Sequence, residues 1–281
     1  MANVLAISSH VLRGQVGLAA TVPALQWLGH EVWALPTVLL ASRPGLGRPV
    51  RRETPAADLA AMLSGLESDG CWPALDAVFT GYFPSPASAT TAAEAIRRIR
   101  QTKPAIHVLV DPILGDEGRL YIAPETAEAI RRELLPLATI ATPNRFELQW
   151  LTGDATGDSA GDHADPIELA RRLGPQIVVV TSASRSRDAV ATRLVTKTED
   201  VEHWSARQPG IPNGAGDLFA GLLLGHLLRA PPACGLPRRH SGSRTSAGCE
   251  RAAARPGPRG VGREVESAEA ANKRRIDALD G

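Results

Sequence analysis

Short apolar runs alternate along this chain with stretches in which apolar residues recur every three or four positions. Runs that are apolar throughout are typical of strands buried on both faces, and the three- and four-residue spacing is typical of amphipathic helices. The apolar runs are VLAIS, EVWALPTV, AVFTG, HVLVDP, TIATP and IVVVTSA, and the helical stretches include ASATTAAEAIRRIR, PETAEAIRRELL and ADPIELARRL. The alternation predicts an α/β fold with three layers, in which a central, mostly parallel sheet is covered by helices on both faces. The later stretches RDAVATRLV and VEHWSA lack an intervening helix, which predicts an antiparallel pair.

The composition argues against several classes of partner. The formal net charge is +1 over 281 residues, which leaves no overall field to attract nucleic acid or an acidic membrane surface. No segment approaches the ~20 apolar residues of a membrane helix, and the first residues lack the basic region of a signal peptide. The three cysteines, Cys71, Cys234 and Cys249, include no close pair, so neither a zinc site nor a disulfide framework is expected. We therefore expect a cytoplasmic protein with no nucleic-acid or membrane partner.

The chain changes character after Leu228. From residue 229 to about residue 262 it is dominated by Arg, Pro, Gly, Ala and Ser, and large aliphatic side chains are nearly absent. Such a segment cannot bury enough apolar surface to offset the entropy of ordering it. We therefore expect a folded domain over residues 1–228 and an atypical, disordered tail over residues 229–281, with room for a short exposed helix at its end. Because the tail lacks interleaved aromatic residues, binding of nucleic acid is disfavoured.

The stretch PNGAGDLFAGLLLGHLL, residues 212–228, combines a glycine turn with an aspartate and a long apolar run. One interpretation is structural, because Asn, Asp and Gly are common where a buried helix begins. The other interpretation is chemical. Gly214 and Gly216 would let backbone N–H groups face an anion at a helix N-terminus, and Asp217 would accept the proton of a substrate hydroxyl group. Transfer of phosphate from ATP to a small alcohol needs both features, but the stretch alone does not decide between the interpretations.

Two further stretches place polar residues at the ends of apolar strands. In TPNRFELQWLTG, Asn144 followed by Glu147 is the pattern of a capping box, and the same side chains would also share one side of a helix start, facing metal and phosphates. In VDPILGDEGRLY, Asp111 ends a buried strand and Asp116 follows in a Gly-rich loop. Turn formation explains these residues without chemistry, but the carboxyl end of a strand is also where a magnesium or phosphate ligand would be placed. Both interpretations stay open for each stretch.

Taken in order, six stretches resemble the pyridoxal kinases of the ribokinase-like superfamily. They are VLAISSHVLRGQVG, VFTGYF, VDPILGDEGRLYIAPE, TPNRFELQWLTG, VVVTSA and NGAGDLFAGLLLGHLL, and the resemblance covers roughly residues 3–228. GAGD and the N-x-x-E pattern are shared across the superfamily, whereas the SSHV opening and TGY are more particular to the pyridoxal branch. The resemblance implies a ribokinase-like fold and ATP-dependent phosphorylation of the 5′-hydroxymethyl group of pyridoxal, or of a related B6 vitamer, to pyridoxal 5′-phosphate.

The resemblance also implies roles for individual residues around the reacting group. Asp217 matches the catalytic base that takes the proton from the 5′-hydroxymethyl group. The anion hole for the transferring phosphoryl group matches Gly214, Ala215 and Gly216. Ser9 matches the residue that hydrogen-bonds the pyridine ring, and Tyr82 matches the aromatic residue beside it.

For the nucleotide and its metal, the resemblance implies a further polar set. Its members are Asp111, Asp116, Tyr121, Thr142, Asn144, Glu147, Thr181 and Ser182. Asp111, Asn144 and Glu147 match residues around Mg²⁺ and the ATP phosphates. Asp116 and Tyr121 lie in a loop near the phosphates. Thr142, Thr181 and Ser182 match residues that line the phosphate side of the nucleotide. Mg²⁺ is the implied cofactor and ATP the co-substrate, with a monovalent cation as a further candidate. Members of the family are commonly dimers, so a homodimer is implied as well.

Some features depart from the family pattern. Leu18 stands where the family often carries Asn, and the loop SRPGLG has Arg43 and Pro44 where a polar Thr or His usually faces the ring. The pattern also stops at Leu228, where the family continues with helices that wall the adenine pocket. We hypothesise that the tail is a frameshifted or decayed form of those helices. The alternatives are a hydroxymethylpyrimidine kinase, although its usual Gly-Ser-Asp stretch is missing, and a non-catalytic relative that binds B6 vitamers or nucleotide.

Overall fold

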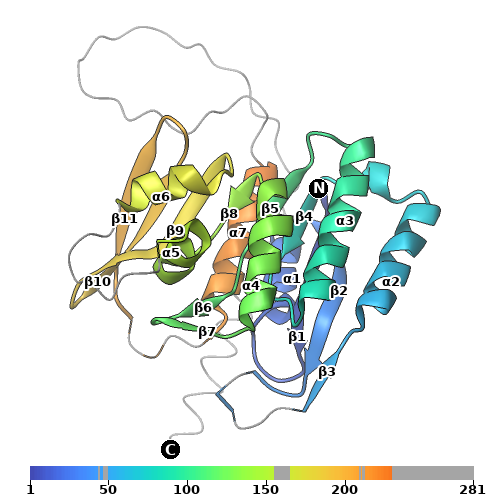
Figure 1. The fold of residues 1–281 in the computed structure, drawn as a ribbon, viewed down its shortest axis with the longest axis horizontal. Coiled ribbons are helices and arrows are strands. Elements are labelled where there is room, and N and C mark those ends of the chain that lie inside the picture. Colours follow the sequence, from blue (N-terminus) through green and yellow to red (C-terminus); the bar gives the residue numbers. More distant parts are fainter. Residues whose placement is uncertain (44, 47–49, 155–164, 209, 211–212, 230–281) are drawn as a thin grey trace, which may run out of the picture. The chain divides into compact units, whose positions relative to one another are not determined.

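A sheet of nine strands runs through the part of the chain that the structure describes, in the order β11-β10-β9-β8-β5-β4-β1-β2-β3 (Figure 1). The strands are β1 (Asn3–Val11), β2 (Glu31–Leu40), β3 (Arg51–Glu53), β4 (Ala77–Thr80), β5 (His107–Val110), β8 (Ile140–Ala141), β9 (Ile177–Arg185), β10 (Ala189–Val195) and β11 (Asp200–Ala206). Strands β2, β1, β4, β5, β8 and β9 are mutually parallel. Their carboxyl ends therefore meet at one edge of the sheet, which is where ligands bind in open α/β sheets.

The computed structural model describes residues 1–43, 45–46, 50–154, 165–208, 210 and 213–229. The predicted tail therefore lies outside the described residues except for Arg229, and so does the short helix expected near its end. In the part that is described, no helix combines the length and the apolar character needed to cross a membrane.

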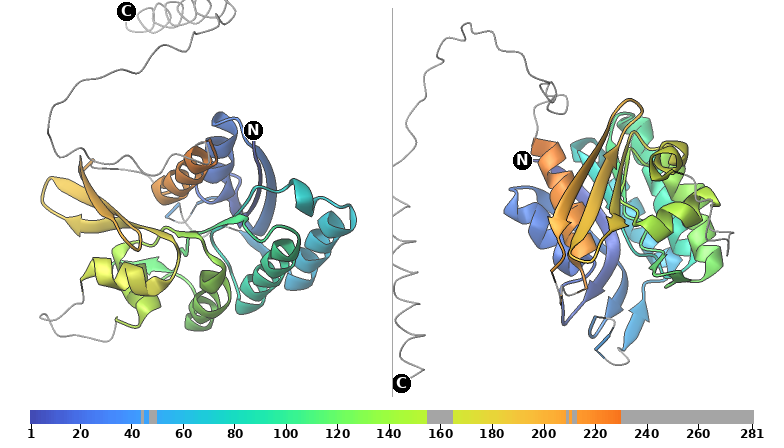
Figure 2. Two further views of the ribbon diagram at one scale, coloured as in Figure 1. Left: turned by 90° about the horizontal axis from the view of Figure 1, so that it is seen from above. Right: turned by 90° about the vertical axis from the view of Figure 1, so that its left-hand side faces the viewer.

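Helices cover both faces of the sheet, so the predicted three-layer α/β architecture is confirmed. Figure 2 shows α1 (Leu18–Trp27) and α7 (Ala215–Arg229) side by side on one face. The helices of the other face are α2 (Ala56–Ser68), α3 (Pro86–Thr102), α4 (Pro124–Ala129), α5 (Arg145–Thr152) and α6 (Pro166–Leu173). The predicted antiparallel pair is also confirmed, since β10 and β11 pair from Ala189 with Ala206 to Val195 with Asp200.

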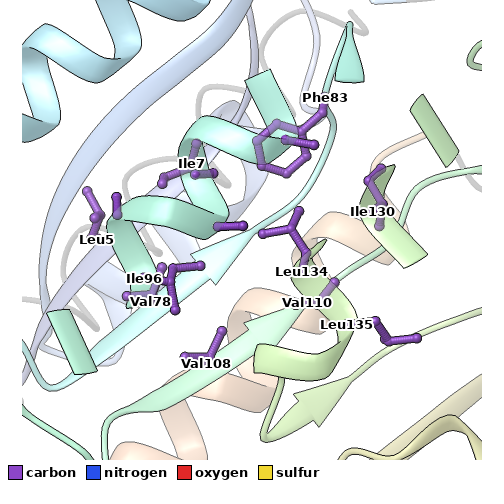
Figure 3. Close-up of a cluster of buried hydrophobic side chains, with 14 of the residues drawn as sticks. Leu5, Ile7, Val78, Phe83, Ile96, Val108, Val110, Ile130, Leu134 and Leu135 are labelled. Atoms are coloured by element: carbon purple, nitrogen blue, oxygen red, sulfur yellow. The ribbon is translucent and has the colours of Figure 1, made fainter. Parts of the chain in front are cut away.

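Alternate side chains of the central strands enter two separate hydrophobic cores. Leu5, Ile7 and Val78 point toward α3, where they pack with Ile96 and Phe83 (Figure 3). Their neighbours in the strands point the other way. That second core contains Val4, Ala6, Ala77, Phe79 and Leu109 from the sheet, Leu18 and Leu25 from α1, and Ala220 and Leu224 from α7. The apolar runs are thus buried on both faces, as their lack of alternation predicts.

Some elements differ from the sequence-based expectation. The patterns do not predict α2, which buries only Leu59 and Leu63 and so carries a weak helical signal. The stretch PETAEAIRRELL, expected as one helix, is α-helical to Ala129 and continues as a π turn, Ile130–Leu134, and a 3₁₀ turn, Leu135–Leu137. Pro136 in that last turn has no N–H group to donate, which prevents the α-helix from continuing.

Candidate active site

The GAGD turn begins α7 at the carboxyl edge of the sheet. Gly214 has φ +105°, and a Cβ atom there would lie 1.7 Å from the carbonyl oxygen of Gln15. Only glycine therefore allows this turn to pack against the loop that follows β1. Asp217 is the third residue of α7, whose 15 residues direct the positive end of the helix dipole at this point. The helix-start interpretation of the stretch is thus confirmed, and the geometry leaves the chemical interpretation available as well.

The Asp217 side chain is half-buried, and its carboxyl group is incompletely hydrogen-bonded. It accepts hydrogen bonds from the backbone N–H groups of Gly17 and of Asp217 itself, while Oδ1 has no hydrogen-bond partner among the described residues. Burial raises the pKa of Asp217, and the two backbone hydrogen bonds oppose that rise in part. The Thr21 hydroxyl donates to the Asp217 carbonyl oxygen over 3.2 Å, which ties α1 to the first turn of α7. The result is a carboxyl group with one oxygen able to accept a proton.

The ends of β1 and β4 bring the two predicted ring-binding residues to this edge. The register of β1 against β2 shifts between Ser8 and Ser9, and Ser9 is buried. A Cβ atom at Gly17 would lie 2.4 Å from Ser9 Oγ, so this hydroxyl lies next to the residue that binds the Asp217 carboxylate. Tyr82 follows the neighbouring strand β4, and its N–H donates to Ser8 Oγ over 3.0 Å. The Ser8 hydroxyl thus supports the backbone at Tyr82.

Asp111 forms a second buried carboxyl group at the end of β5. Only 7% of the residue is exposed, and the Thr142 hydroxyl donates to its Oδ1 over 3.0 Å. Burial raises the pKa of Asp111 well above its usual value, and repulsion from the Asp217 and Glu147 carboxylates raises it further. Three acidic side chains from distant parts of the sequence therefore lie close enough together to influence one another's ionisation.

Asn144 and Glu147 form the capping box that their spacing predicts. Asn144 Oδ1 accepts from the Glu147 N–H over 2.9 Å, and Glu147 Oε2 accepts from the Asn144 N–H over 2.8 Å. Glu147 Oε1 accepts from the Leu114 N–H over 2.8 Å, and Asn144 Nδ2 donates to the Gly115 carbonyl over 2.8 Å. Burial raises the pKa of Glu147 to about 7. The pair thus fixes the start of α5 to the loop after β5, next to Asp111.

The other predicted nucleotide residues lie at the same edge. Asp116 belongs to a hairpin of two short strands, β6 (Gly115–Asp116) and β7 (Arg119–Leu120), where the sequence suggested only a loop. Tyr121 follows β7 with 57% of its surface exposed, and burial of its remainder and the nearby Asp116 carboxylate raise its pKa. Thr181 lies opposite Asn144 in an isolated parallel bridge, and its N–H donates to the Pro143 carbonyl over 2.9 Å. Ser182 follows with φ +50°.

Three glycines that are not among the predicted site residues also shape this edge. Gly17 has φ +57°, and a Cβ atom there would lie 2.2 Å from the Ser9 carbonyl oxygen. At Gly81 a Cβ atom would lie 2.4 Å from Ser8 Oγ, and at Gly115 one would lie 2.1 Å from the Arg119 carbonyl oxygen. The sequence signal for all three was a glycine directly beside a motif residue, as in QVG, TGY and LGD.

Leu18 and Arg43, which differ from the family pattern, both lie close to the loop after β1 or to the core beside it. Leu18 is the first residue of α1 and is fully buried in the core under α7, so an apolar side chain fits where the family often carries Asn. Arg43 lies against the loop after β1, because a Cβ atom at Gly14 would be 3.0 Å from Arg43 Cβ, and the Arg43 N–H donates to the Arg13 carbonyl over 3.0 Å. Pro44 is outside the described residues.

A magnesium ion fits the chemistry of these side chains. In the described part of the chain, no group of three or more His, Cys, Asp or Glu side chains is arranged to enclose a metal ion. Mg²⁺ does not need such a cage, since it is usually held by one or two carboxylates together with waters and substrate phosphates. The mutual repulsion of Asp111, Glu147 and Asp217 is the kind of charge that a cation would offset.

Comparison with known proteins identifies the family of this chain. Residues 69–232 match the family model described as phosphomethylpyrimidine kinase. Pyridoxal kinase PdxY of Granulibacter bethesdensis is 36% identical over 233 residues, which cover 80% of this chain and 82% of that protein. This chain belongs to the pyridoxal kinase family. Pyridoxal kinase PdxY of Deinococcus radiodurans is 37% identical over 237 residues, with 81% of this chain and 79% of that protein covered.

Solved structures of pyridoxal kinases have the same fold. Pyridoxal kinase from Leishmania donovani, in complex with ADP and pyridoxine, superposes with a TM-score of 0.74 at 29% identity, over 82% of this chain and 80% of that one. Pyridoxal kinase from Entamoeba histolytica also gives a TM-score of 0.74, at 26% identity, over 83% of this chain and 84% of that one. The ribokinase-like fold that the resemblance implied is therefore confirmed.

Proposed function

We propose that this member of the pyridoxal kinase family transfers the γ-phosphoryl group of ATP to the 5′-hydroxymethyl group of pyridoxal or a related B6 vitamer. Relatives named pyridoxal kinase, and a structural neighbour that binds ADP and pyridoxine, support this activity. The observation that carries the proposal is the Asp217 carboxyl group. It lies half-buried beside Gly17 at the start of α7, with Oδ1 shielded from solvent and unpartnered among the described residues.

In the proposed reaction Asp217 is the general base. Its Oδ1 accepts the hydroxyl proton while the 5′-oxygen forms a bond to the γ-phosphorus and the bond from that phosphorus to the leaving ADP oxygen breaks. The raised pKa makes the Asp217 carboxylate a stronger base than an exposed aspartate. The hydrogen bonds from the N–H groups of Gly17 and Asp217 favour the ionised carboxylate, which is the form that can accept a proton.

The turn that holds Asp217 is proposed to bind the transferring phosphoryl group. Gly214 precedes α7, and Ala215 and Gly216 are its first two residues, where helix N–H groups lack intrahelical partners. Such groups and the helix dipole favour an anion. Because the turn packs against Gln15, these donors are held in place before the substrate binds.

The polar residues of the neighbouring strands are proposed to hold the nucleotide and its cation. Mg²⁺ is assigned to Asp111, and to Asn144 and Glu147 through water, since the capping box already occupies the latter pair. When bound, Mg²⁺ offsets the phosphate charge and orients the γ-phosphoryl group. The remaining nucleotide contacts are assigned to Asp116, Tyr121, Thr142, Thr181 and Ser182. A monovalent cation is a further proposed cofactor.

At the substrate end, Ser9 and Tyr82 are proposed to hold the pyridine ring. The proximity of Ser9 Oγ to Gly17 supports this assignment, because Gly17 also binds the proposed base. We further propose that the protein is a homodimer in the cytoplasm, where ATP is available. Its kinase domain comprises residues 1–228, and residues 229–281 form a distinct tail.

A direct assay separates this proposal from its alternatives. Purified protein is given Mg²⁺ and ATP with either pyridoxal or hydroxymethylpyrimidine, and the phosphorylated product is measured beside an Asp217→Asn variant. We expect turnover of pyridoxal, and a loss of about 10²–10⁴-fold in kcat for the variant, because the proton has no acceptor. Preference for hydroxymethylpyrimidine would favour a hydroxymethylpyrimidine kinase. Pyridoxal binding without turnover would favour a non-catalytic relative, and unchanged kcat in the variant would refute the role of Asp217.

A further inference from the structure

We propose that Arg185, at the end of β9, binds the phosphates of ATP. This inference rests on the proposed function and adds a nucleotide-binding residue to the set that the sequence motifs indicate. Arg185 lies outside every stretch on which the family resemblance was built.

The direction of β9 places Arg185 at the same edge of the sheet as the proposed nucleotide site. This strand runs parallel to β8, so its carboxyl end extends beyond the same edge of the sheet as the ends of β5 and β8. Thr181 of β9 is already level with Asn144 at the proposed nucleotide site, and Arg185 lies four residues farther along the strand. The side chain therefore starts from the rim of the site, on the proposed nucleotide side.

Arg185 forms two long ion pairs with carboxylates of the β6–β7 segment. One guanidinium nitrogen lies 3.7 Å from Asp116 Oδ2, and another lies 3.9 Å from Glu117 Oε1. The Arg185 side chain thus reaches across to the β6–β7 hairpin, whose Asp116 carboxylate also influences Glu147 and Tyr121. Both separations exceed hydrogen-bond length, and all three side chains are more than a third exposed, so these pairs are weak and easily exchanged.

The proposed nucleotide site needs positive charge to bind a triphosphate. Asp111, Glu147 and Asp217 make this edge acidic, and the triphosphate brings further negative charge. A guanidinium group offers a planar pair of N–H donors that matches two phosphate oxygens, and such charge-assisted pairs are stronger than the loose contacts to Asp116 and Glu117. When ATP binds, the Arg185 guanidinium would therefore exchange its contacts with Asp116 and Glu117 for hydrogen bonds to the phosphate oxygens.

The experiment compares Arg185→Ala with Arg187→Ala, which removes the same charge two residues along the chain. For Arg185→Ala we expect the KM for ATP to rise about 10- to 100-fold, the range expected for loss of a charge-assisted hydrogen bond, with less than a twofold change in the KM for pyridoxal. ADP binding, measured by calorimetry, should weaken by a similar factor, while inhibition by adenosine, which lacks phosphates, should not change. Arg185→Lys should recover part of the loss, and Arg187→Ala should behave as the wild type.

Three results would overturn the inference. The first is a KM for ATP within twofold of the wild type in Arg185→Ala. The second is an equal effect of Arg187→Ala, which would indicate long-range charge instead of contact. The third is an equal weakening of adenosine and ADP, which would mean that Arg185 only holds the hairpin in place. If the wild type binds ADP but does not phosphorylate pyridoxal, the proposed function fails while the ADP titrations still test Arg185.

Discussion

Burial raises the pKa of both Asp217 and Glu147, but the two carboxyl groups differ in their hydrogen bonds. Both oxygens of Glu147 accept backbone N–H groups, which holds the start of α5 against the loop after β5. Asp217 Oδ1 is shielded from solvent and has no partner among the described residues, so its capacity to accept a hydrogen bond is unfilled. At the scale of single residues, the unfilled acceptor position of Asp217 therefore distinguishes the proposed base from Glu147, whose two oxygens are both hydrogen-bonded.

The pKa of Glu147 predicts how stability depends on pH. Because burial raises that pKa to about 7, the native state binds this proton more tightly than the unfolded chain does. The resulting stabilisation is complete below the usual glutamate pKa and is lost as the pH rises through about 7. In protein without nucleotide or Mg²⁺, we expect the free energy of unfolding to fall between pH 5 and pH 8, with Glu147 contributing at most about 3 kcal/mol of the change.

Urea unfolding of Glu147→Gln at several pH values measures that contribution. The variant should be less stable at low pH, because one backbone donor loses its acceptor at a cost of about 1–3 kcal/mol, but its pH dependence should be flatter. Glu94→Gln on the exposed surface of α3 is the control and should follow the wild type. A variant with the full wild-type slope would assign the pH dependence to other groups, Asp111 first.

At the scale of elements, α7 has two functions because its start and its body face different surroundings. Its first turn packs on the loop after β1 through Gly214, and its apolar side packs on α1 and the sheet through Ala220 and Leu224. Gly221 allows the close approach of the two helices, since a Cβ atom there would already lie 3.2 Å from Thr21. The proposed anion hole is therefore positioned by helix packing as well as by the glycine turn.

Alanine substitution at two glycines of the turn tests how strictly its backbone is constrained. Gly214→Ala requires φ +105° from a residue with a Cβ atom and brings that atom against Gln15, so we expect a loss of about 2 kcal/mol or more. Gly216→Ala meets nothing within 4 Å in a helical position, so stability should hold or rise by up to about 1 kcal/mol. Urea midpoints of both variants give the comparison, and equal midpoints would show that the turn adapts.

At the scale of the whole molecule, the described residues place only α1 and α7 over one face of the sheet. The second hydrophobic core therefore depends strongly on α7, the same helix that carries the proposed base. We expect stability and activity to be coupled through this helix, since loosening its packing would also displace Asp217. Ligands that bind the native site should in turn stabilise the fold.

Leu224→Ala tests this coupling. Leu224 is fully buried, so we expect a loss of about 2–5 kcal/mol in the free energy of unfolding and a lower unfolding temperature. Leu218→Ala is the matched control, because 45% of Leu218 is exposed, and its unfolding temperature should stay close to that of the wild type. Mg²⁺ and ATP should restore part of the lost unfolding temperature in Leu224→Ala. Equal effects of the two substitutions would contradict the packing role of α7.

Features with local causes were predictable from the sequence by itself. The apolar runs predicted strands buried on both faces, the Asn144 and Glu147 spacing predicted a capping box, and GAGD predicted a helix start. Each of these depends on a few neighbouring residues, on side-chain periodicity or on the first turn of a helix. The resemblance to pyridoxal kinases added the family, which the known proteins confirm. The nature of residues 230–281 stays a prediction, because they lie outside the described part of the chain.

Only the tertiary structure decided which residues meet at the carboxyl edge of the sheet. Gly17 binds the carboxylate of Asp217 from 200 positions away in the sequence, Gly214 packs on Gln15, and Arg185 reaches the hairpin at Asp116. No local pattern encodes these contacts, because they arise from strand order, helix packing and the exclusion of a Cβ atom at a close approach. The same burial raises the pKa of Asp217, so the ionisation on which the proposed chemistry depends is a property of the folded chain and not of the GAGD motif.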